Sequence, residues 1–389
     1  MGRESRRYRI FVLGAGFSRS AGLPLADQLW HEVRDKAKSL SGRAVKFWED
    51  LEAYVQFRRD CGENADSHDQ VNFEDFMAFL DIEHYLGLRG SDTYSPDGNE
   101  SQIVVKTLIA QVLTEATPPM GRLPDLYIRF AKLLQPNDLI LTFNYDVLLE
   151  RALETIGKPY RLFPHRFQDV RPEVAVVDTS HEETIILKLH GSIDWFDRTQ
   201  YTKSEPFYRK HGCSRDPNPV FTNMAELQVL PLLDGPSFPN DPLCEMYRVR
   251  QIDRLYQEAS PLSCSPWLLN PSSAKMLYSR PLRDFWYGLG DVGARNFGLA
   301  IIGFSLAPHD DYTRQAMYRI VKNYQGYCWD EEFSGLRKSP LVLVDKTESI
   351  GKEEEFRRRY AFVDWDKAIT YMGGFDENAI DAIFGREQD

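Results

Sequence analysis

One histidine of this sequence lies where a short apolar run ends, in the segment Lys188-Leu189-His190-Gly191-Ser192. An imidazole with an unperturbed pKa of about 6.5 can act as a general base near neutral pH. The glycine beside it leaves the backbone open to a ligand. The alternative is a structural role, which is the commoner one for a lone histidine. His190 is therefore a candidate general base.

A second group of polar side chains follows another apolar run, in Thr142-Phe143-Asn144-Tyr145-Asp146. Because side chains alternate along a strand, at least two of Thr142, Asn144 and Asp146 are expected to face the same crevice while the strand lasts. The alternative is local, with Asn144 or Asp146 capping the helix that follows.

Three further strand ends carry residues that could contact a ligand. Gly14-Ala15-Gly16 follows the first apolar run, where glycines allow close approach and free N–H groups at a helix start attract phosphate. Gly303-Phe304-Ser305-Leu306 is a similar glycine and hydroxyl turn, and Asp345 ends the last run. Each could also be a plain turn. A dehydrogenase is not expected, because Arg19 replaces the third glycine of G-x-G-x-x-G and no acidic residue ends a second strand about 20 positions later.

Five short apolar runs are predicted to form buried parallel strands, and most are followed by helix-like sequence. Alternating strands and helices predict an α/β fold, with a Rossmann-like parallel sheet flanked by helices and a ligand at the carboxyl ends of the strands. The predicted strands are Arg9–Gly14, Leu139–Phe143, Ile185–Leu189, Leu299–Gly303 and Leu341–Val344, and the clearest helices are Asp146–Ile156 and Asp310–Val321.

Two stretches interrupt this alternation. Residues of about 25–135 have a helical pattern, including an amphipathic run from Asn72 to Leu86, and we interpret them as a helical insertion. Residues of about 200–280 are rich in proline, serine and aromatic side chains, and we interpret them as an irregular insertion. The whole chain, residues 1–389, is predicted to be one ligand-binding domain that carries both insertions.

Composition excludes several classes of protein. With 42% hydrophobic and 13% aromatic residues, the chain is globular rather than disordered. A net charge of −11 disfavours direct nucleic-acid binding. No apolar window is long enough to span a membrane, and the N-terminus has no signal-peptide pattern. The cysteines are scattered and odd in number, which favours a reduced, cytoplasmic protein without a cysteine zinc module: Cys61, Cys213, Cys244, Cys264 and Cys328.

The order of the motifs is more informative than any one of them. GAGFSRSAGLP (14–24), TFNYD (142–146), KLHG (188–191), GFSL (303–306) and then Asp345 resemble the sirtuin family over the sheet-forming parts of nearly the whole chain. The family pattern reads roughly G-A-G-I-S-x-x-[SA]-G-I-P-D-F-R, T-Q-N-I-D, H-G and G-[TS]-S. The resemblance implies a fold that binds NAD as a substrate.

Three departures qualify this resemblance. The two C-x-x-C pairs that hold the structural zinc of deacylating sirtuins are absent, so no metal is expected. Leu25-Ala26-Asp27 replaces D-F-R, and Phe143 replaces the glutamine of T-Q-N. With the helical segment NFEDFMAFLD (72–81), these traits resemble the divergent sirtuin-like branch of bacterial antiphage systems. Members of that branch hydrolyse NAD and act in oligomers, often beside an ATPase or another sensor protein.

The resemblance also implies roles for individual residues. Asn144 would position the ribose or the attacking water, Asp146 would contact the nicotinamide carboxamide, and His190 would be the general base. The residues implied to hold the rest of NAD are Gly14, Ala15, Gly16, Phe17, Ser18, Thr142, Gly303, Phe304, Ser305 and Asp345.

The function implied is an NAD glycohydrolase of a defence system, releasing nicotinamide and ADP-ribose. We expect it to form a homo-oligomer and to be regulated by a HerA-like ATPase or another defence-system protein. Two alternatives stay open: an NAD-dependent deacylase or ADP-ribosyl transferase, and a scaffold subunit that binds NAD or ADP-ribose without catalysis.

Overall fold

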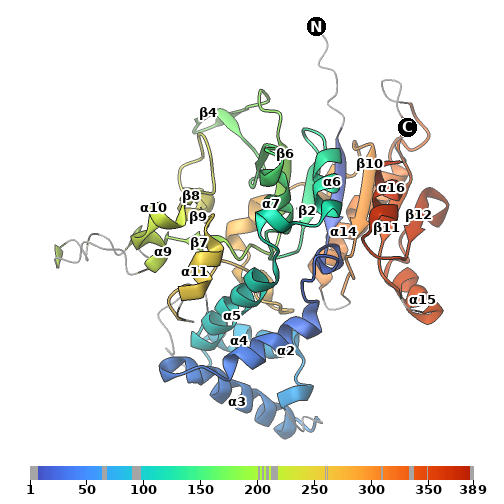
Figure 1. Ribbon diagram of the computed structural model, residues 1–389. Helices are drawn as coiled ribbons and strands as arrows, with labels where there is room; N and C mark the ends of the chain where they lie inside the picture. Colours follow the sequence, from blue (N-terminus) through green and yellow to red (C-terminus); the bar gives the residue numbers. More distant parts are fainter. Residues whose placement is uncertain are drawn as a thin grey trace. The chain divides into compact units, whose positions relative to one another are not determined.

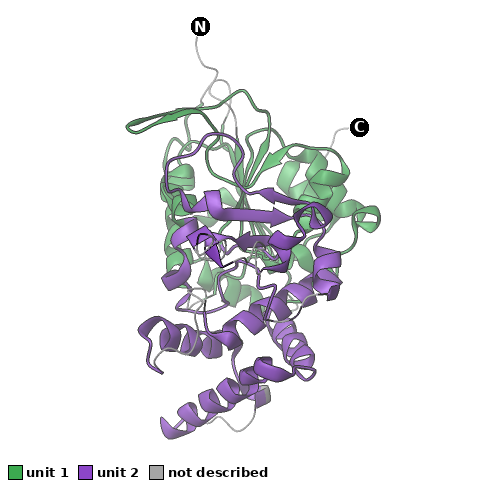
Figure 2. Ribbon diagram, turned by 90° about the vertical axis from the view of Figure 1, so that its left-hand side faces the viewer, with its two compact units in different colours: residues 1–25, 117–189, 283–389 green, residues 26–116, 190–282 purple. Residues whose placement is uncertain are grey.

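The computed structural model describes residues 8–63, 68–89, 98–199, 202–203, 206, 210–211, 218–258, 260, 262–307, 310–332, 337–347 and 349–385. The chain divides into two compact units, which are coloured separately in Figure 2. Unit 1 comprises residues 1–25, 117–189 and 283–389, and unit 2 comprises residues 26–116 and 190–282.

Unit 1 is built on a seven-stranded sheet in the order β12-β11-β10-β1-β2-β6-β3, in which every pair of neighbours is parallel. The predicted α/β, Rossmann-like fold class is therefore confirmed. All five predicted strands are present, and β3 and β12 were not predicted. The strands are β1 (Arg9–Leu13), β2 (Leu139–Thr142), β3 (Tyr160–Arg161), β6 (Thr184–Lys188), β10 (Gly298–Ile302), β11 (Leu341–Val344) and β12 (Ala368–Tyr371).

The central strands are apolar because helices of unit 1 flank the sheet (Figure 1). Phe11 of β1 contacts Phe130 of α6 and Phe384 of α16, with ring centroids 5.7 and 5.5 Å apart. The predicted helices after β2 and β10 are present as α7 and α14. The helices of unit 1 are α1 (Ala15–Arg19), α6 (Asp125–Leu133), α7 (Leu148–Thr155), α12 (Arg283–Trp286), α13 (Leu289–Val292), α14 (Asp311–Gly326), α15 (Ile350–Arg359) and α16 (Glu377–Phe384), with short 3-10 turns at Met120–Arg122 and Trp365–Lys367.

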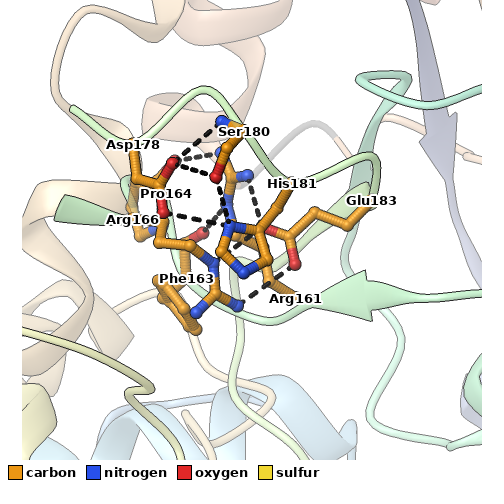
Figure 3. Close-up of polar contacts among 8 residues, drawn as sticks. All are labelled: Arg161, Phe163, Pro164, Arg166, Asp178, Ser180, His181 and Glu183. Atoms are coloured by element: carbon orange, nitrogen blue, oxygen red, sulfur yellow. Dashed lines mark hydrogen bonds and ion pairs between the residues drawn. The ribbon is translucent and has the colours of Figure 1, made fainter. Parts of the chain in front are cut away.

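An antiparallel hairpin, β4 (Phe167–Arg171) and β5 (Val174–Val177), lies between β3 and β6 in the chain. Figure 3 shows the polar contacts at its base, where Arg161 and Arg166 both donate to the carboxylate of Glu183, at 2.9 and 3.1 Å. Burial raises the pKa of Glu183, but the two guanidinium groups outweigh it and hold this pKa below its ordinary value. The ion pairs thereby tie the hairpin to the start of β6.

Unit 2 combines helices with a three-stranded antiparallel sheet in the order β7-β9-β8. This sheet lies within and beside the segment interpreted as irregular, and its strands are too short to give a sequence signal. The strands are β7 (Trp195–Asp197), β8 (Val229–Pro231) and β9 (Met246–Val249). The helices are α2 (Ala26–Ala37), α3 (Lys46–Asp60), α4 (Phe73–Leu86), α5 (Glu100–Ala116), α9 (Pro219–Thr222), α10 (Met224–Leu227) and α11 (Ile252–Glu258), with 3-10 turns at Gly42–Val45, His68–Gln70, Pro242–Glu245, Lys275–Tyr278 and Arg280–Leu282.

The amphipathic run predicted from Asn72 is α4. The Asn72 side chain accepts hydrogen bonds from the backbone N–H groups of Glu74 and Asp75, which caps the helix start. Phe73 stacks on Trp30 of α2, with ring centroids 4.5 Å apart, and forms part of the core of the helical segment. Among the described cysteines, Cys61, Cys244, Cys264 and Cys328 are free thiols, and Cys213 lies outside the described residues.

Candidate functional site

The strand order places a candidate site at the carboxyl end of β1. The chain adds β2 on one side of β1 and later returns to add β10 on the other side. Loops after neighbouring strands diverge at such a switch point, and ligands of doubly wound sheets bind there. The motifs that follow β1, β2 and β10 are the glycine loop, TFNYD and GFSL.

Glycines allow the loops after β1 and β10 to cross in contact. Gly303 adopts a φ of +60°, and a Cβ placed there would lie 2.3 Å from the backbone of Gly16 and Phe17. A Cβ on Gly14 would lie 2.5 Å from the Gly303 carbonyl oxygen. These contacts exclude any side chain, so the glycines are required for packing between the two loops.

The crossing corrects one expectation about the glycine loop. The N–H groups of Gly14 and Gly16 were expected to be free for phosphate, but they donate to the carbonyl oxygens of Ile302 and Gly303, at 3.0 and 2.9 Å. The N–H of Phe17 donates to the Gly14 carbonyl oxygen at 2.9 Å. These three amides are engaged because the loop packs against β10 and begins α1 at Ala15. The assignment of Gly14–Ser18 to cofactor binding stays a prediction.

Beneath the glycine loop, unit 1 brings Ser18, Asn144 and Asp146 together in a buried polar cluster. The Ser18 hydroxyl donates to Asp146 Oδ2 at 2.8 Å. Asn144 Nδ2 lies 2.9 Å from the Gly14 carbonyl oxygen and 3.2 Å from Ser18 Oγ. All three residues are buried, although 128 residues of sequence separate Ser18 from Asp146. The motifs of β1 and β2 therefore form one site.

Thr142 and Asp146 also have local roles within TFNYD. Thr142 Oγ1 accepts a hydrogen bond from the Asn144 N–H at 3.1 Å, and Asp146 Oδ1 accepts one from the Leu148 N–H at 3.0 Å. The second contact satisfies the N–H of the first residue of α7, although the N-cap position itself is Val147 and neither Asn144 nor Asp146 occupies it. Asp146 uses its other carboxylate oxygen for Ser18, so one side chain serves both the helix and the cluster.

Two charged residues behind Asp146 were not singled out from the sequence. Lys188, the last residue of β6, donates through Nζ to the Asp146 carbonyl oxygen and to Glu150 Oε1. The Lys188 and Glu150 side chains are only 1% and 3% exposed. A lysine inside an otherwise apolar strand was the one signal that could have pointed to this pair.

The space enclosed by this cluster is small. A cavity of about 10 Å³ is lined by Leu13, Phe17, Thr142, Asn144, Asp146, Leu149, Glu150 and Lys188. Such a volume accommodates about one water molecule and no aromatic ring. A ligand group that contacts Asp146 therefore has to displace or share the Ser18 hydroxyl.

The GFSL loop and Asp345 lie on the β10 side of the sheet. Phe304 stacks on Phe143 with ring centroids 4.4 Å apart, which joins the loops after β10 and β2. Ser305 is exposed. Asp345 follows β11 and accepts a hydrogen bond from the Lys346 N–H at 2.8 Å. Burial raises the pKa of Asp345.

His190 is the first residue of the second segment of unit 2 and follows the end of β6 by two positions. In unit 1, the Leu189 N–H donates to the Thr142 carbonyl oxygen at 2.9 Å, so the chain leaves the sheet beside TFNYD. In unit 2, the His190 carbonyl oxygen accepts a hydrogen bond from the Leu269 N–H at 2.9 Å. Burial, and then the charge of Lys275, hold the pKa of His190 well below its usual value. Its imidazole is therefore neutral at pH 7.

The structure thus joins the β1, β2 and β10 motifs within unit 1, while His190 and Lys275 belong to unit 2. Lys275, like Lys188, was not singled out from the sequence. It belongs to no motif, and its effect on His190 is a charge interaction between segments far apart in the chain.

Comparison with known proteins relates part of the chain to a protein family. A family model described as a SIR2-like domain matches residues 138–227, which include TFNYD and KLHG. The match supports a sirtuin-like family and an enzyme that uses NAD. A search of curated proteins gave no match.

The described residues contain no candidate membrane span and no candidate metal site. Within that part of the chain, no helix has the length and apolar character needed to cross a membrane. In the same residues, no group of three or more histidine, cysteine, aspartate or glutamate side chains could hold a metal ion.

Proposed function

We propose that this protein is an NAD glycohydrolase, which converts NAD and water into nicotinamide and ADP-ribose. The observation that carries the proposal is the buried cluster of Ser18, Asn144 and Asp146 at the switch point of the sheet. Together with the SIR2-like match over TFNYD and KLHG, it favours a site for the nicotinamide half of NAD.

The reaction breaks the bond between nicotinamide and the ribose carbon C1′. Positive charge develops on the ribose as the pyridinium leaves as neutral nicotinamide, so the site must orient the leaving group and present a nucleophile. We assign the contact with the carboxamide to Asp146, which the Ser18 and Leu148 hydrogen bonds hold in place. Asn144, buried beside it, orients the ribose or the attacking water.

His190 supplies the base in this proposal. Water adds to C1′ and gives one proton to the neutral imidazole, which later releases it to solvent. The lowered pKa of His190 keeps the imidazole unprotonated and able to accept a proton at neutral pH, and it also makes this group a weaker base than a free imidazole. No step needs a metal, because the leaving group is already cationic.

The diphosphate and adenosine half of NAD is assigned from the motif resemblance of the glycine loop and GFSL. The two loops meet at Gly14, Gly16 and Gly303. Because the N–H groups of Gly14, Gly16 and Phe17 already donate within the protein, contacts with the diphosphate would come from other groups of these segments. We assign the diphosphate and adenosine half to Gly14–Ser18 and to Gly303–Ser305, with Asp345 as a ribose contact.

Identification of the products tests the proposal. Purified protein is incubated with NAD, with and without an acylated peptide, and the products are separated by chromatography. Nicotinamide and ADP-ribose in equal amounts, formed without peptide, are expected, and His190→Ala should lower the rate by about 10²–10⁴-fold. Turnover only with an acylated peptide would indicate a deacylase. Binding of NAD without turnover under every partner condition would favour the scaffold alternative.

We further propose that this activity belongs to an antiphage defence system and depends on assembly. The motif resemblance supports this part, since the helical segment at 72–81 and the absence of a C-x-x-C pair are shared with that branch. The expected assembly is a homo-oligomer, with a HerA-like ATPase or another defence-system protein as regulator, in the cytoplasm.

A further inference from the structure

Lys188 is a buried cation that the proposed reaction does not use. Its side chain is 1% exposed, and its ammonium group contacts the Asp146 carbonyl oxygen and, at 2.9 Å, Glu150 Oε1. These contacts join the end of β6 to the loop and helix that follow β2. Lys188 therefore lies directly behind a residue assigned to the nicotinamide group.

Asp146 is held at three of its atoms. Lys188 binds the backbone carbonyl oxygen, the Leu148 N–H binds Oδ1 at 3.0 Å, and the Ser18 hydroxyl binds Oδ2 at 2.8 Å. Of these three contacts, the one with Lys188 is made to the backbone of Asp146 and restrains its peptide group. If Ser18 moves to admit a ligand, Lys188 still restrains the backbone from which the Asp146 side chain projects.

Stability alone does not explain a buried lysine and glutamate. Removing two charges from water costs free energy, and the attraction between the charges often does not offset this cost. Apolar residues of similar volume can therefore replace such a pair with little loss of stability. Besides pairing with Glu150, Lys188 donates a hydrogen bond to a carbonyl oxygen of the TFNYD loop, that of Asp146. A requirement that the TFNYD loop be precisely oriented accounts for both the buried ion pair and the hydrogen bond from Lys188 to this loop.

We propose that Lys188 is a positioning residue, which orients Asp146 toward the nicotinamide carboxamide. In this arrangement Glu150 balances the positive charge of Lys188. The role of Asp146 rests on the proposed function, whereas the restraint on its backbone does not. A displacement of about 1 Å in such a group can reduce turnover by about 100-fold.

The test separates positioning from folding with a double substitution. Lys188→Met alone leaves Glu150 buried without its cation, so this variant is expected to melt at a much lower temperature. Lys188→Met combined with Glu150→Met removes both charges and should recover most of the melting temperature. Lys158→Met is the matched control in unit 1. Lys158 Nζ also donates to backbone carbonyl oxygens, those of Ala131, Lys132 and Leu134, near the amino end of β2.

Two readouts are measured on each variant. Hydrogen exchange of the peptide covering residues 143–149 should be faster in the double variant, because the loop loses its restraint, and unchanged in Lys158→Met. Release of nicotinamide should show kcat lowered by about 10- to 100-fold with KM for NAD changed far less, since the diphosphate contacts remain.

The outcomes distinguish the two proposals. Wild-type exchange in residues 143–149 of the stable double variant would overturn the role of Lys188, whether or not the protein cleaves NAD. Faster exchange with an unchanged kcat would equally overturn it. If the wild-type protein releases no nicotinamide under any partner condition, the proposed function fails, and exchange alone then decides whether Lys188 orients the loop.

Discussion

The pKa of His190 is shifted in the folded protein by two causes. Burial lowers its pKa, and the positive charge of Lys275 lowers it further. The unfolded chain takes up a proton near pH 6.5, whereas the folded chain does so only at lower pH. The stability that this group contributes is therefore complete above about pH 6.5 and is lost as the pH falls toward the folded pKa.

Replacing Lys275 should move the pH dependence of activity. Lys275→Met removes a positive charge near His190, so the pKa of the imidazole should rise toward 6.5. The acidic limb of the profile of kcat/KM against pH should then shift to higher pH, because this limb reports ionisations of the free enzyme. Lys36→Met, which removes a lysine paired with Glu115, is the control that should leave the limb unchanged. A limb that does not move in Lys275→Met would contradict this account.

Gly303, where the loops after β1 and β10 meet, has to be glycine for two reasons. Its backbone is left-handed, and no space is left for a Cβ. Gly157 separates these reasons, because its φ of +66° is close to the +60° of Gly303 but no atom lies within 4 Å of its Cβ position. Gly157→Ala should cost about 1–2 kcal/mol of stability from backbone strain alone. Gly303→Ala should cost clearly more, because its Cβ meets the Gly16 backbone.

Urea unfolding of both variants measures this difference, and nicotinamide release by Gly303→Ala should be lost or strongly reduced. Equal losses of stability in the two variants would show that the loops are not packed as described.

The length and burial of each strand decided whether the sequence pattern could predict it. Strands β1, β2, β6, β10 and β11 were predicted because they are apolar runs buried within the sheet. The edge strands β3 and β12 were missed, since β3 has two residues and β12 is only partly buried. The antiparallel strands of unit 2 have three or four residues each, too few for periodicity to appear.

The candidate site was predictable to the extent that its residues lie at strand ends. Asn144 and Asp146 follow β2, and the parallel sheet brings them to the loop that carries Ser18. Lys188 was read as part of a motif but given no role, because its partners Asp146 and Glu150 lie 42 and 38 positions away. Such contacts depend on tertiary structure, which sequence spacing does not encode.

In the whole molecule, the segment that matches the SIR2-like family model extends over both units. Residues 138–189 of the matched segment belong to unit 1 and residues 190–227 to unit 2. Asn144 and Asp146 belong to unit 1, and His190 belongs to unit 2. The boundaries of the two insertions, and the interpretation of the chain as one domain, stay predictions.

Assembly is a property of the whole chain and is tested on it. Light scattering of the purified protein should give a mass that is a multiple of the 45.0 kDa chain, and a candidate ATPase should change nicotinamide release when added. A monomer that hydrolyses NAD fully at every concentration, with no response to a partner, would contradict the proposed regulation.

The central claim is that Asn144 takes part in cleaving NAD, and one comparison of rates tests it most directly. Nicotinamide release without peptide is measured for the wild type, Asn144→Ala and Asn296→Ala, with and without the candidate partner. Asn296 is a buried asparagine of unit 1 whose Nδ2 also donates to a carbonyl oxygen, that of Gly298 at 2.7 Å. Asn144→Ala should lower the rate by about 100-fold or more, while folded Asn296→Ala stays near the wild type. An Asn144→Ala variant as active as the wild type would contradict the account.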